Sequence, residues 1–133
     1  MRAANLLVGS TLGELAKHIR PGVSTAYLDK IADTFIRDHG AVPTFKGFPN
    51  PYGRPFPASI CTSVNACVVH GVPSEDQILK DGDIVSIDCG TLLDGFNGDS
   101  AYTFPVGEIS EELKTLLLTT KESLYKGIEQ AVH

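Results

Sequence analysis

A β-hairpin signature constrains the fold of this chain more than any other feature of its sequence. Two runs of apolar and β-branched residues flank a turn-rich segment with Asp94-Gly95 at its centre. Asp-Gly is favoured in two-residue hairpin turns, because both turn residues adopt positive φ. With this turn, Asp88 and Asp99 become diagonal neighbours on one face of the hairpin, roughly 7–8 Å apart at the backbone. The pattern therefore predicts two antiparallel strands that carry two carboxylates on the same face.

The rest of the chain shows helical periodicity in three segments and two further strand patterns. We expect the first helix to end before Pro21-Gly22, the second to run from the N-cap Ser24 to Gly40, and the third to begin at Ser110. The expected apolar helix faces are Ala4, Val8, Leu12, Leu15 and Ile19, then Leu28, Ile31, Ala32 and Phe35, then Leu113, Leu116, Leu117, Leu124 and Ile128, and the expected strands are 59–64, 67–70, 84–90 and 100–106. This order predicts a single α+β domain over residues 1–133, with helices on one face of a largely antiparallel sheet.

Residues 43–57 fit neither a helix nor a strand. Five of the eight prolines fall in this segment, among the aromatic residues Phe45, Phe48, Tyr52 and Phe56. Proline fixes φ and lacks a backbone N–H donor, which excludes a regular helix or a central strand. Two interpretations remain open. The segment is either an ordered loop that holds aromatic side chains over a binding site, or a packed surface loop without a ligand.

Charge and cysteine content narrow the functional class. Eleven basic residues against sixteen acidic ones give a net charge of -5, which argues against direct nucleic-acid binding. The apolar runs are shorter than the ~20 residues needed to span a bilayer, so no membrane association is expected. The three cysteines are odd in number and lack the spacing of a zinc site. They indicate free thiols in a reducing compartment, and we expect a cytoplasmic protein.

The carboxylates of the hairpin are open to two interpretations. Asp88 lies within an apolar run, where an ionised carboxylate is costly unless it is paired, hydrogen-bonded or bound to a metal. Residues 81–100 contain no Lys or Arg, so a divalent cation is a natural counter-charge for Asp88 and Asp99. The spacing alone nevertheless favours a structural role, in which backbone groups satisfy both carboxylates. His70, at the end of a strand pattern, is likewise either a structural or a catalytic group.

Ordered motifs along most of the chain resemble a known family. They are ICTSVN at 60–65, VHGVP at 69–73, LKDGDIVSID at 79–88 and DGFNGD at 94–99. Together they resemble the bacterial-type methionine aminopeptidase family. The resemblance implies the N-terminal half of a pita-bread fold and a metallo-exopeptidase that removes the initiator methionine from nascent proteins.

The resemblance also assigns residues. It implies that Asp88 and Asp99 are ligands of two divalent metal ions, which would be Co, Mn, Fe(II) or Zn. It implies that His70 is catalytic and contacts the substrate near the scissile bond. Phe45, Phe48 and Cys61 fall where the family lines its methionine side-chain pocket. Two features depart from the family pattern: Phe45 and Phe48 occupy positions often held by Tyr, and residues 50–56 are longer than in the commonest bacterial form.

The family is built from two related halves, and the remaining ligands, a His and two Glu, come from the second half. The glutamates near the end of this chain do not match those ligands, so we expect the isolated 133-residue chain to be inactive. The implied partners are nascent polypeptide N-termini at the ribosome and the missing C-terminal half of the same protein. An uncovered half-interface should be apolar, which predicts self-association.

Two rival functions stay open at this point. A pita-bread domain that lacks metals would serve as a non-catalytic peptide- or protein-binding module. A proline-specific or creatinase-like peptidase of the same fold is the second rival, and the dense match of the motifs makes it the weaker one.

Overall fold

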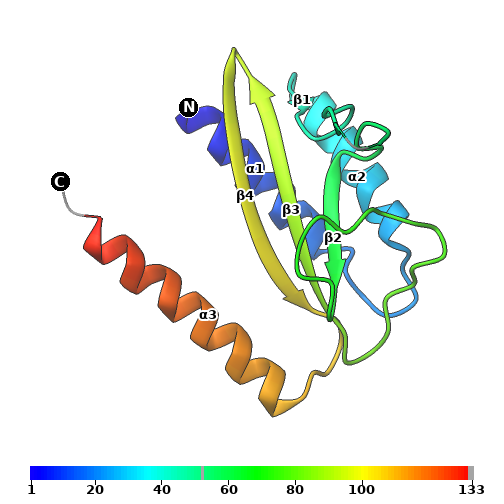
Figure 1. Ribbon diagram of the computed structural model, residues 1–133, viewed down its shortest axis with the longest axis vertical. Helices are drawn as coiled ribbons and strands as arrows, with labels where there is room; N and C mark the ends of the chain where they lie inside the picture. Colours follow the sequence, from blue (N-terminus) through cyan, green and yellow to red (C-terminus); the bar gives the residue numbers. More distant parts are fainter. Residues whose placement is uncertain (52, 132–133) are drawn as a thin grey trace.

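The computed structural model of this chain describes residues 1–51 and 53–131, so Tyr52 of the aromatic segment lies outside the described residues. The elements, in chain order, are α1 (Arg2–Ala16), α2 (Thr25–Asp38), β1 (Val42–Pro43), β2 (Ile60–Val64), β3 (Ile84–Leu93), β4 (Phe96–Pro105) and α3 (Glu111–Gln130). Figure 1 shows one sheet with α1 and α2 behind it and α3 projecting away from it. The α+β class expected from the sequence is confirmed.

The sheet is built around β3 and is antiparallel throughout. β4 lies on one side of β3, and β1 and β2 lie end to end on the other side. Asp94 has φ 51° and Gly95 has φ 78°, which are the positive values that a two-residue hairpin turn requires. Asp88 faces Ala101 across the hairpin, as the turn predicted. Both strands continue up to the turn, so they are longer at that end than the predicted ranges 84–90 and 100–106.

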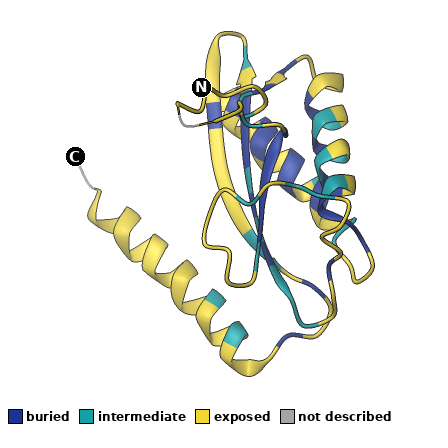
Figure 2. Ribbon diagram, turned by 45° about the vertical axis from the view of Figure 1, so that its right-hand side comes forward, coloured by how far each residue is buried: buried dark blue, intermediate teal, exposed yellow. Residues whose placement is uncertain are grey.

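The core lies between the sheet and the first two helices. Val85, Ile87 and Cys89 alternate along β3 and are fully buried. They form one cluster with side chains from α1 and α2, among them Leu15 and Leu28. Burial of each such aliphatic side chain contributes about 1.5–3 kcal/mol to folding. Figure 2 shows the buried residues concentrated in this layer, while the opposite face of the sheet is largely uncovered.

The last helix does not share the sheet face that α1 and α2 cover, contrary to the expectation from the sequence. α3 begins where Ser110 was predicted to cap it, and the Ser110 Oγ accepts a hydrogen bond from the Leu113 backbone N–H at 3.3 Å. No residue of α3 is buried, however, and in Figure 2 the helix is exposed along almost its whole length. Its periodicity predicted a helix correctly, but the apolar face has no partner within the described residues.

One predicted strand and the predicted end of the first helix differ from the structure. Residues 67–70 do not form a strand, because the chain reverses after β2 and His70 adopts a left-handed φ of 58°. Gly71 then packs against β2, where its N–H donates to the Ser63 Oγ at 3.1 Å. The first helix ends at Ala16, three residues before Ile19, although Ile19 still packs against the core. None of the described helices combines the length and the apolar character needed to cross a bilayer.

Candidate functional site

The polar face of the sheet carries the sequence-predicted ligands. Strand pairing places Cys61 on β2 opposite Asp88 on β3, and Asp88 opposite Ala101 on β4. Asp99 lies two residues before Ala101, on the same face of β4. Because the alternate residues of β3 are buried against the helices, this row of side chains points to the opposite, open face. The hairpin therefore presents both carboxylates away from the core.

The two carboxylates of the hairpin interact directly. Asp88 on β3 and Asp99 on β4 are diagonal neighbours on the same face, and both line one cavity. Partial burial raises the pKa of Asp88 above its ordinary value, and the negative charge of Asp99 raises it further. The positive charge available on His70 acts in the opposite direction. Arg54 lines the same cavity, but among the ion pairs of the described residues none joins a Lys or Arg to Asp88 or Asp99, so the two acids remain a partly uncompensated pair.

His70 reaches this pair from the loop after β2. Its left-handed backbone is held by the next residue, because the Gly71 carbonyl accepts the Thr62 N–H at 2.8 Å and the Gly71 N–H is bound to Ser63. A Cβ atom at Gly71 would run into the Thr62 carbonyl group. The close approach of this glycine to β2 therefore fixes where the His70 side chain begins.

The aromatic segment forms the wall of a cavity that opens beside the carboxylates. The cavity has a volume of about 740 Å³ and is lined by Phe45, Phe48, Phe56, Cys61, His70, Asp88 and Asp99, with prolines of the same segment. Its loop is closed by two backbone hydrogen bonds between its ends, from Gly47 N–H to the Phe56 carbonyl at 2.8 Å and from Phe56 N–H to the Phe48 carbonyl at 3.0 Å. Of the two interpretations of this segment, the structure favours the ordered loop that holds aromatic side chains beside a cavity.

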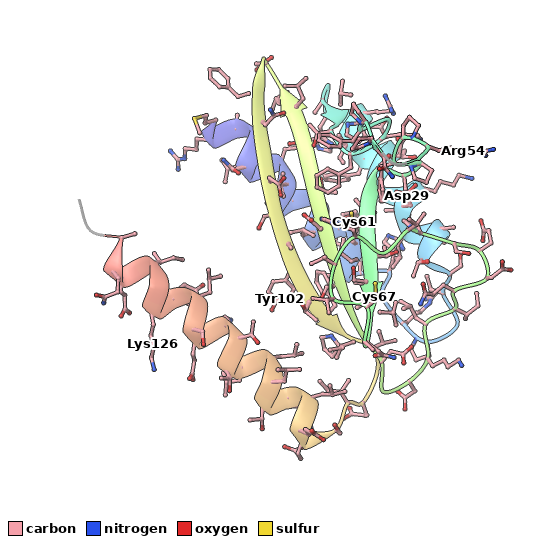
Figure 3. All side chains as sticks on the ribbon, in the orientation of Figure 1. Asp29, Arg54, Cys61, Cys67, Tyr102 and Lys126 are labelled. Carbon is pink, nitrogen blue, oxygen red and sulfur yellow. The ribbon has the colours of Figure 1, made fainter. Side chains whose placement is uncertain are left out.

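The predicted pocket residues differ in exposure. Phe48 is 64% exposed at the rim, Phe45 is half-buried, and Cys61 is 5% exposed at the base. Burial, then the charges of Asp88 and Asp99, raise the pKa of the Cys61 thiol to about 11. The thiol is therefore neutral at physiological pH, which excludes a role as a thiolate nucleophile. Figure 3 shows Cys61 on β2 and Arg54 at the outer side of the loop, pointing away from the sheet.

A second set of acidic residues, not identified from the sequence, supports the cavity wall from α2. Asp29 accepts the backbone N–H groups of Ser59 and Ile60, at 2.7 and 3.0 Å. Asp33 accepts the Ser59 hydroxyl at 2.6 Å and the Lys46 ammonium at 3.2 Å. These bonds tie the start of β2 and the aromatic loop to one helix. Their sequence signal is weak, because Asp29 and Asp33 are separated by an ordinary helical step of four residues.

A glycine on β3 also went unnoticed in the sequence. Gly90 lies opposite Asp99, and a Cβ atom on it would collide with the Thr44 hydroxyl and the Phe45 ring. The absence of a side chain lets Phe45 lie directly over the strand that carries Asp88. A glycine inside a strand pattern is a signal for such a close approach.

The carboxylates suit a metal but do not complete its coordination. Asp88 and Asp99 offer hard oxygen ligands of the kind that divalent cations such as Mg and Mn prefer. Within residues 1–51 and 53–131, however, no group of three or more His, Cys, Asp or Glu side chains is placed to hold a metal ion. The described chain thus supplies part of a site, and its donor chemistry fits a divalent cation.

Known proteins with similar sequences are named methionine aminopeptidases. The protein from Clostridium acetobutylicum is 54% identical over 132 residues, which cover 99% of this chain and 51% of that protein. Methionine aminopeptidase 1 from Bacillus subtilis is 53% identical over 131 residues, which cover 98% of this chain and 50% of that protein. The chain therefore spans about half the length of these relatives.

Solved structures agree with the sequence comparison. The methionine aminopeptidase of Rickettsia prowazekii superposes with a TM-score of 0.87 at 41% identity, covering 96% of this chain and 49% of its own. An Xaa-Pro dipeptidase from Bacillus anthracis gives 0.70 at 26% identity, covering 86% of this chain and 29% of its own. The family described as metallopeptidase family M24 matches residues 1–133. With the whole described fold and both hairpin carboxylates inside that match, the chain belongs to metallopeptidase family M24.

Proposed function

We propose that this chain is part of a metal-dependent aminopeptidase that removes the initiator methionine from nascent proteins. The observation that carries the proposal is the aromatic cavity of about 740 Å³ that opens onto Asp88 and Asp99. An exopeptidase of this kind needs an apolar side-chain pocket beside its hydrolytic centre. The names of relatives that are 53–54% identical support methionine as the residue removed.

The hairpin carboxylates take the role of metal ligands in this proposal. Asp88 and Asp99 would hold divalent cations, of which Co, Mn, Fe(II) and Zn are the candidates. When bound, such cations supply Lewis-acid activation of water and of the scissile carbonyl group. His70, whose charge acts on Asp88, would donate a hydrogen bond to the substrate peptide and orient it. A further His and two Glu would have to complete the ligand set, since the described residues offer no third ligand.

The aromatic loop and Cys61 would bind the methionine side chain. A thioether packs well against the edges of aromatic rings, which Phe45 and Phe48 provide at the cavity wall. The neutral thiol of Cys61 closes the base of the cavity without placing a charge there. The substrates would be the N-termini of nascent chains at the ribosome in the cytoplasm.

One observation favours a second function for the chain as it stands. A cavity lined by aromatic residues, without a three-ligand metal site among the described residues, is also what a peptide-binding module would present. In that case the chain binds N-terminal peptides without cleaving them. Metal binding distinguishes the aminopeptidase from the peptide-binding module, because the module does not require a cation at Asp88.

The test joins this chain to the part of the Clostridium acetobutylicum relative that it does not cover, and measures methionine release from a Met-Ala peptide with Mn or Co. We expect metal-dependent release that is lost in Asp88→Asn and Asp99→Asn and retained in Asp94→Asn. Asp94 is the matched control, because it is an exposed acid in the hairpin turn away from the cavity. Metal-independent peptide binding without release would support the module instead.

A further inference from the structure

Asp29 of α2 binds the chain where the aromatic loop, residues 43–57, leads into β2. Its Oδ1 atom alone accepts two backbone N–H groups, from Ser59 at 2.7 Å and from Ile60 at 3.0 Å. Both residues are fully buried, so their N–H groups depend on Asp29 for an acceptor. Cys61, at the base of the cavity, is the next residue along the strand. Figure 3 shows Asp29 and Cys61 at the same end of β2, so the base of the cavity is positioned from α2.

Asp33, one helical turn after Asp29, binds both ends of the same loop. Its Oδ1 atom accepts the Ser59 hydroxyl at 2.6 Å and the Lys46 ammonium at 3.2 Å. Arg37, a further turn along α2, donates to the Asp33 Oδ2 atom at 2.9 Å and holds the carboxylate in place. Because Lys46 precedes most prolines of the loop and Ser59 follows them, one carboxylate joins the two ends of the loop.

Phe45, the half-buried wall of the cavity, lies between two anchored residues. On one side, the Thr44 N–H donates to the Gly90 carbonyl at 3.1 Å, which fastens the chain to β3. On the other side, Lys46 binds Asp33 on α2. The Phe45 ring also lies so close over Gly90 that a Cβ atom there would meet it. The position of the aromatic wall is therefore set by α2 and β3 together.

The bonds of the two acids differ in how much the loop depends on them. Lys46 and Arg37 are exposed, and ion pairs at the surface contribute little to stability. The N–H groups of Ser59 and Ile60 are buried, and a buried donor left without an acceptor is costly. Asp29 is therefore the residue whose removal should loosen the cavity most.

We propose that Asp29 and Asp33 are positioning residues that fix the distance between the aromatic wall and Cys61, and that this fixed width selects the unbranched side chain of methionine over branched ones. The inference rests on the proposed function, in which the cavity takes a methionine side chain. An apolar pocket has only small packing differences with which to discriminate side chains of similar size, so its walls must not move apart. Walls supported by a helix hold such a geometry better than a loop alone.

The first experiment measures how fast iodoacetamide modifies Cys61 in the 133-residue chain, with the exposed Cys67 replaced by Ser. Peptide mass spectrometry follows Cys61 and Cys89 separately. Cys89 is fully buried in the core, so its modification reports unfolding of the whole chain, whereas Cys61 also reports opening of the loop. Asp29→Ala should accelerate modification of Cys61 at least about tenfold more than that of Cys89. Equal acceleration of both thiols would overturn the proposal, because it would show an effect on global stability alone.

Asp29→Asn separates the hydrogen bonds of Asp29 from its charge. An Asn side chain keeps the Oδ1 acceptor but is neutral. The raised pKa of the Cys61 thiol is due first to burial, and the charge of Asp29 contributes to it, so both substitutions remove the same electrostatic effect. Only the Ala variant should therefore accelerate modification strongly. Equal rates in the Asn and Ala variants would contradict a role of the hydrogen bonds.

Asp38→Ala is the matched control on the same helix. Asp38 is an exposed acid at the end of α2, and no ion pair within residues 1–51 and 53–131 includes it. Its substitution should leave the rates at Cys61 and Cys89 unchanged. Acceleration at Cys61 in this variant as large as in Asp29→Ala would overturn the assignment to Asp29.

Ser59→Ala keeps the test valid if Asp29→Ala fails to fold. It removes the hydroxyl that binds Asp33 but leaves the backbone N–H bound to Asp29, so the fold should persist. Circular dichroism checks the fold of each variant. Modification of Cys61 should accelerate about fivefold relative to Cys89. An unchanged ratio of the two rates would contradict the proposal.

The second experiment measures selectivity in the fusion protein that tests the proposed function, with Met-Ala and Leu-Ala peptides. Asp29→Ala should lower the preference in kcat/KM for Met-Ala at least about threefold, mainly through a higher KM. Asp29→Asn should restore the preference, and Asp38→Ala should retain it. An active fusion protein whose preference does not respond to Asp29→Ala would refute this inference alone. An inactive fusion protein with the expected thiol rates would refute the proposed function, while Asp29 would still position the cavity.

Discussion

Asp88 and Asp99 lie diagonally across the β3–β4 hairpin, close enough for the charge of Asp99 to raise the pKa of Asp88, although neither is the other's direct partner. Asp88 faces Ala101 and Asp99 faces Gly90, so the two side chains meet on the diagonal. This arrangement puts two acids on one face of a sheet with burial and mutual repulsion both opposing ionisation of Asp88. It is unfavourable for the chain alone and favourable for binding a cation.

The first prediction concerns Asp88→Asn. In metal-free buffer, removal of the like-charge contact should stabilise the chain at neutral pH by about 0.2–1 kcal/mol. The sign follows from the raised pKa of Asp88, because ionisation of that group costs more in the folded chain than in the unfolded one. The same substitution should abolish any rise in melting temperature on addition of Mn. Thermal unfolding with and without Mn measures both effects; destabilisation in metal-free buffer would contradict the repulsion.

The second prediction concerns acid stability and Asp33. The hydrogen bond from Arg37, with further bonds from Ser59 and Lys46, lowers the pKa of Asp33 to about 2. Because the pKa of Asp33 is lower in the folded chain than its ordinary value of 3.8, the ionised carboxylate stabilises the fold at pH values above about 3.8. That contribution, at most about 2 kcal/mol before solvent screening, should be lost as the pH falls from about 4 to 2.

The variant that tests this contribution is Asp33→Asn. Its unfolding free energy at pH 7 should be lower than that of the parent chain, and the difference should shrink on acidification to pH 2. Urea unfolding at several pH values measures it, with Asp76→Asn, at an exposed residue, as the control. A constant difference across this pH range would contradict the role of the Asp33 charge.

The third prediction concerns two glycines with opposite outcomes. Gly71→Ala should destabilise the chain by about 1–3 kcal/mol, since its Cβ atom would meet the Thr62 carbonyl group. Gly127→Ala, in the last turn of an exposed helix with open space around it, should instead raise helix content and stabilise by at most about 0.5–1 kcal/mol. Circular dichroism during thermal unfolding measures both. Equal effects of the two substitutions would contradict the tight contact at Gly71.

The fourth prediction concerns thiol reactivity. Cys67 is exposed, whereas Cys61 and Cys89 are buried and burial raises their pKa values to about 11 and about 12. At pH 8 only about one Cys61 thiol in a thousand is ionised, so a thiol reagent such as Ellman's should titrate one group rapidly. Cys67→Ser should remove that rapid phase. Two rapid groups in the parent chain would mean that the cavity exposes Cys61.

The fifth prediction concerns the aromatic rim. Phe48→Ala should leave the stability of the chain nearly unchanged, because the side chain is 64% exposed. In the fusion protein used to test the proposed function, it should raise KM for a Met-Ala peptide more than it lowers kcat. Phe96→Ala is the control, since Phe96 is 52% exposed but lies outside the cavity. An equal change in KM for both variants would argue against a methionine pocket at Phe48.

The hairpin is the part of the fold that the local sequence predicts best. Asp94-Gly95 sets the turn, and the alternation of apolar residues along β3 sets which face is buried. Register and faces together place Asp88 and Asp99 on the open side, so this half of the candidate site was predictable. The strand lengths were less predictable, because β3 and β4 remain paired up to the residues that flank the turn.

Other elements depended on contacts that the local pattern does not contain. Residues 67–70 have a strand-like composition, yet the contact of Gly71 with β2 and the left-handed turn at His70 override it. α3 has the periodicity of a packed helix, but periodicity does not specify a partner, and no residue of the helix is buried.

The sequence by itself determined the helices, the hairpin, its register and the side of the sheet on which both aspartates lie, because these follow from turn chemistry and from residue periodicity over short distances. The tertiary structure alone decided that Phe45 and Phe48 meet Asp88 and His70 around one cavity. These groups are far apart in the chain, and their meeting depends on the closure of the aromatic loop, the packing of Gly71 on β2 and the missing side chain at Gly90. Such contacts are set by shape and backbone hydrogen bonding across the fold, which no short stretch of residues encodes.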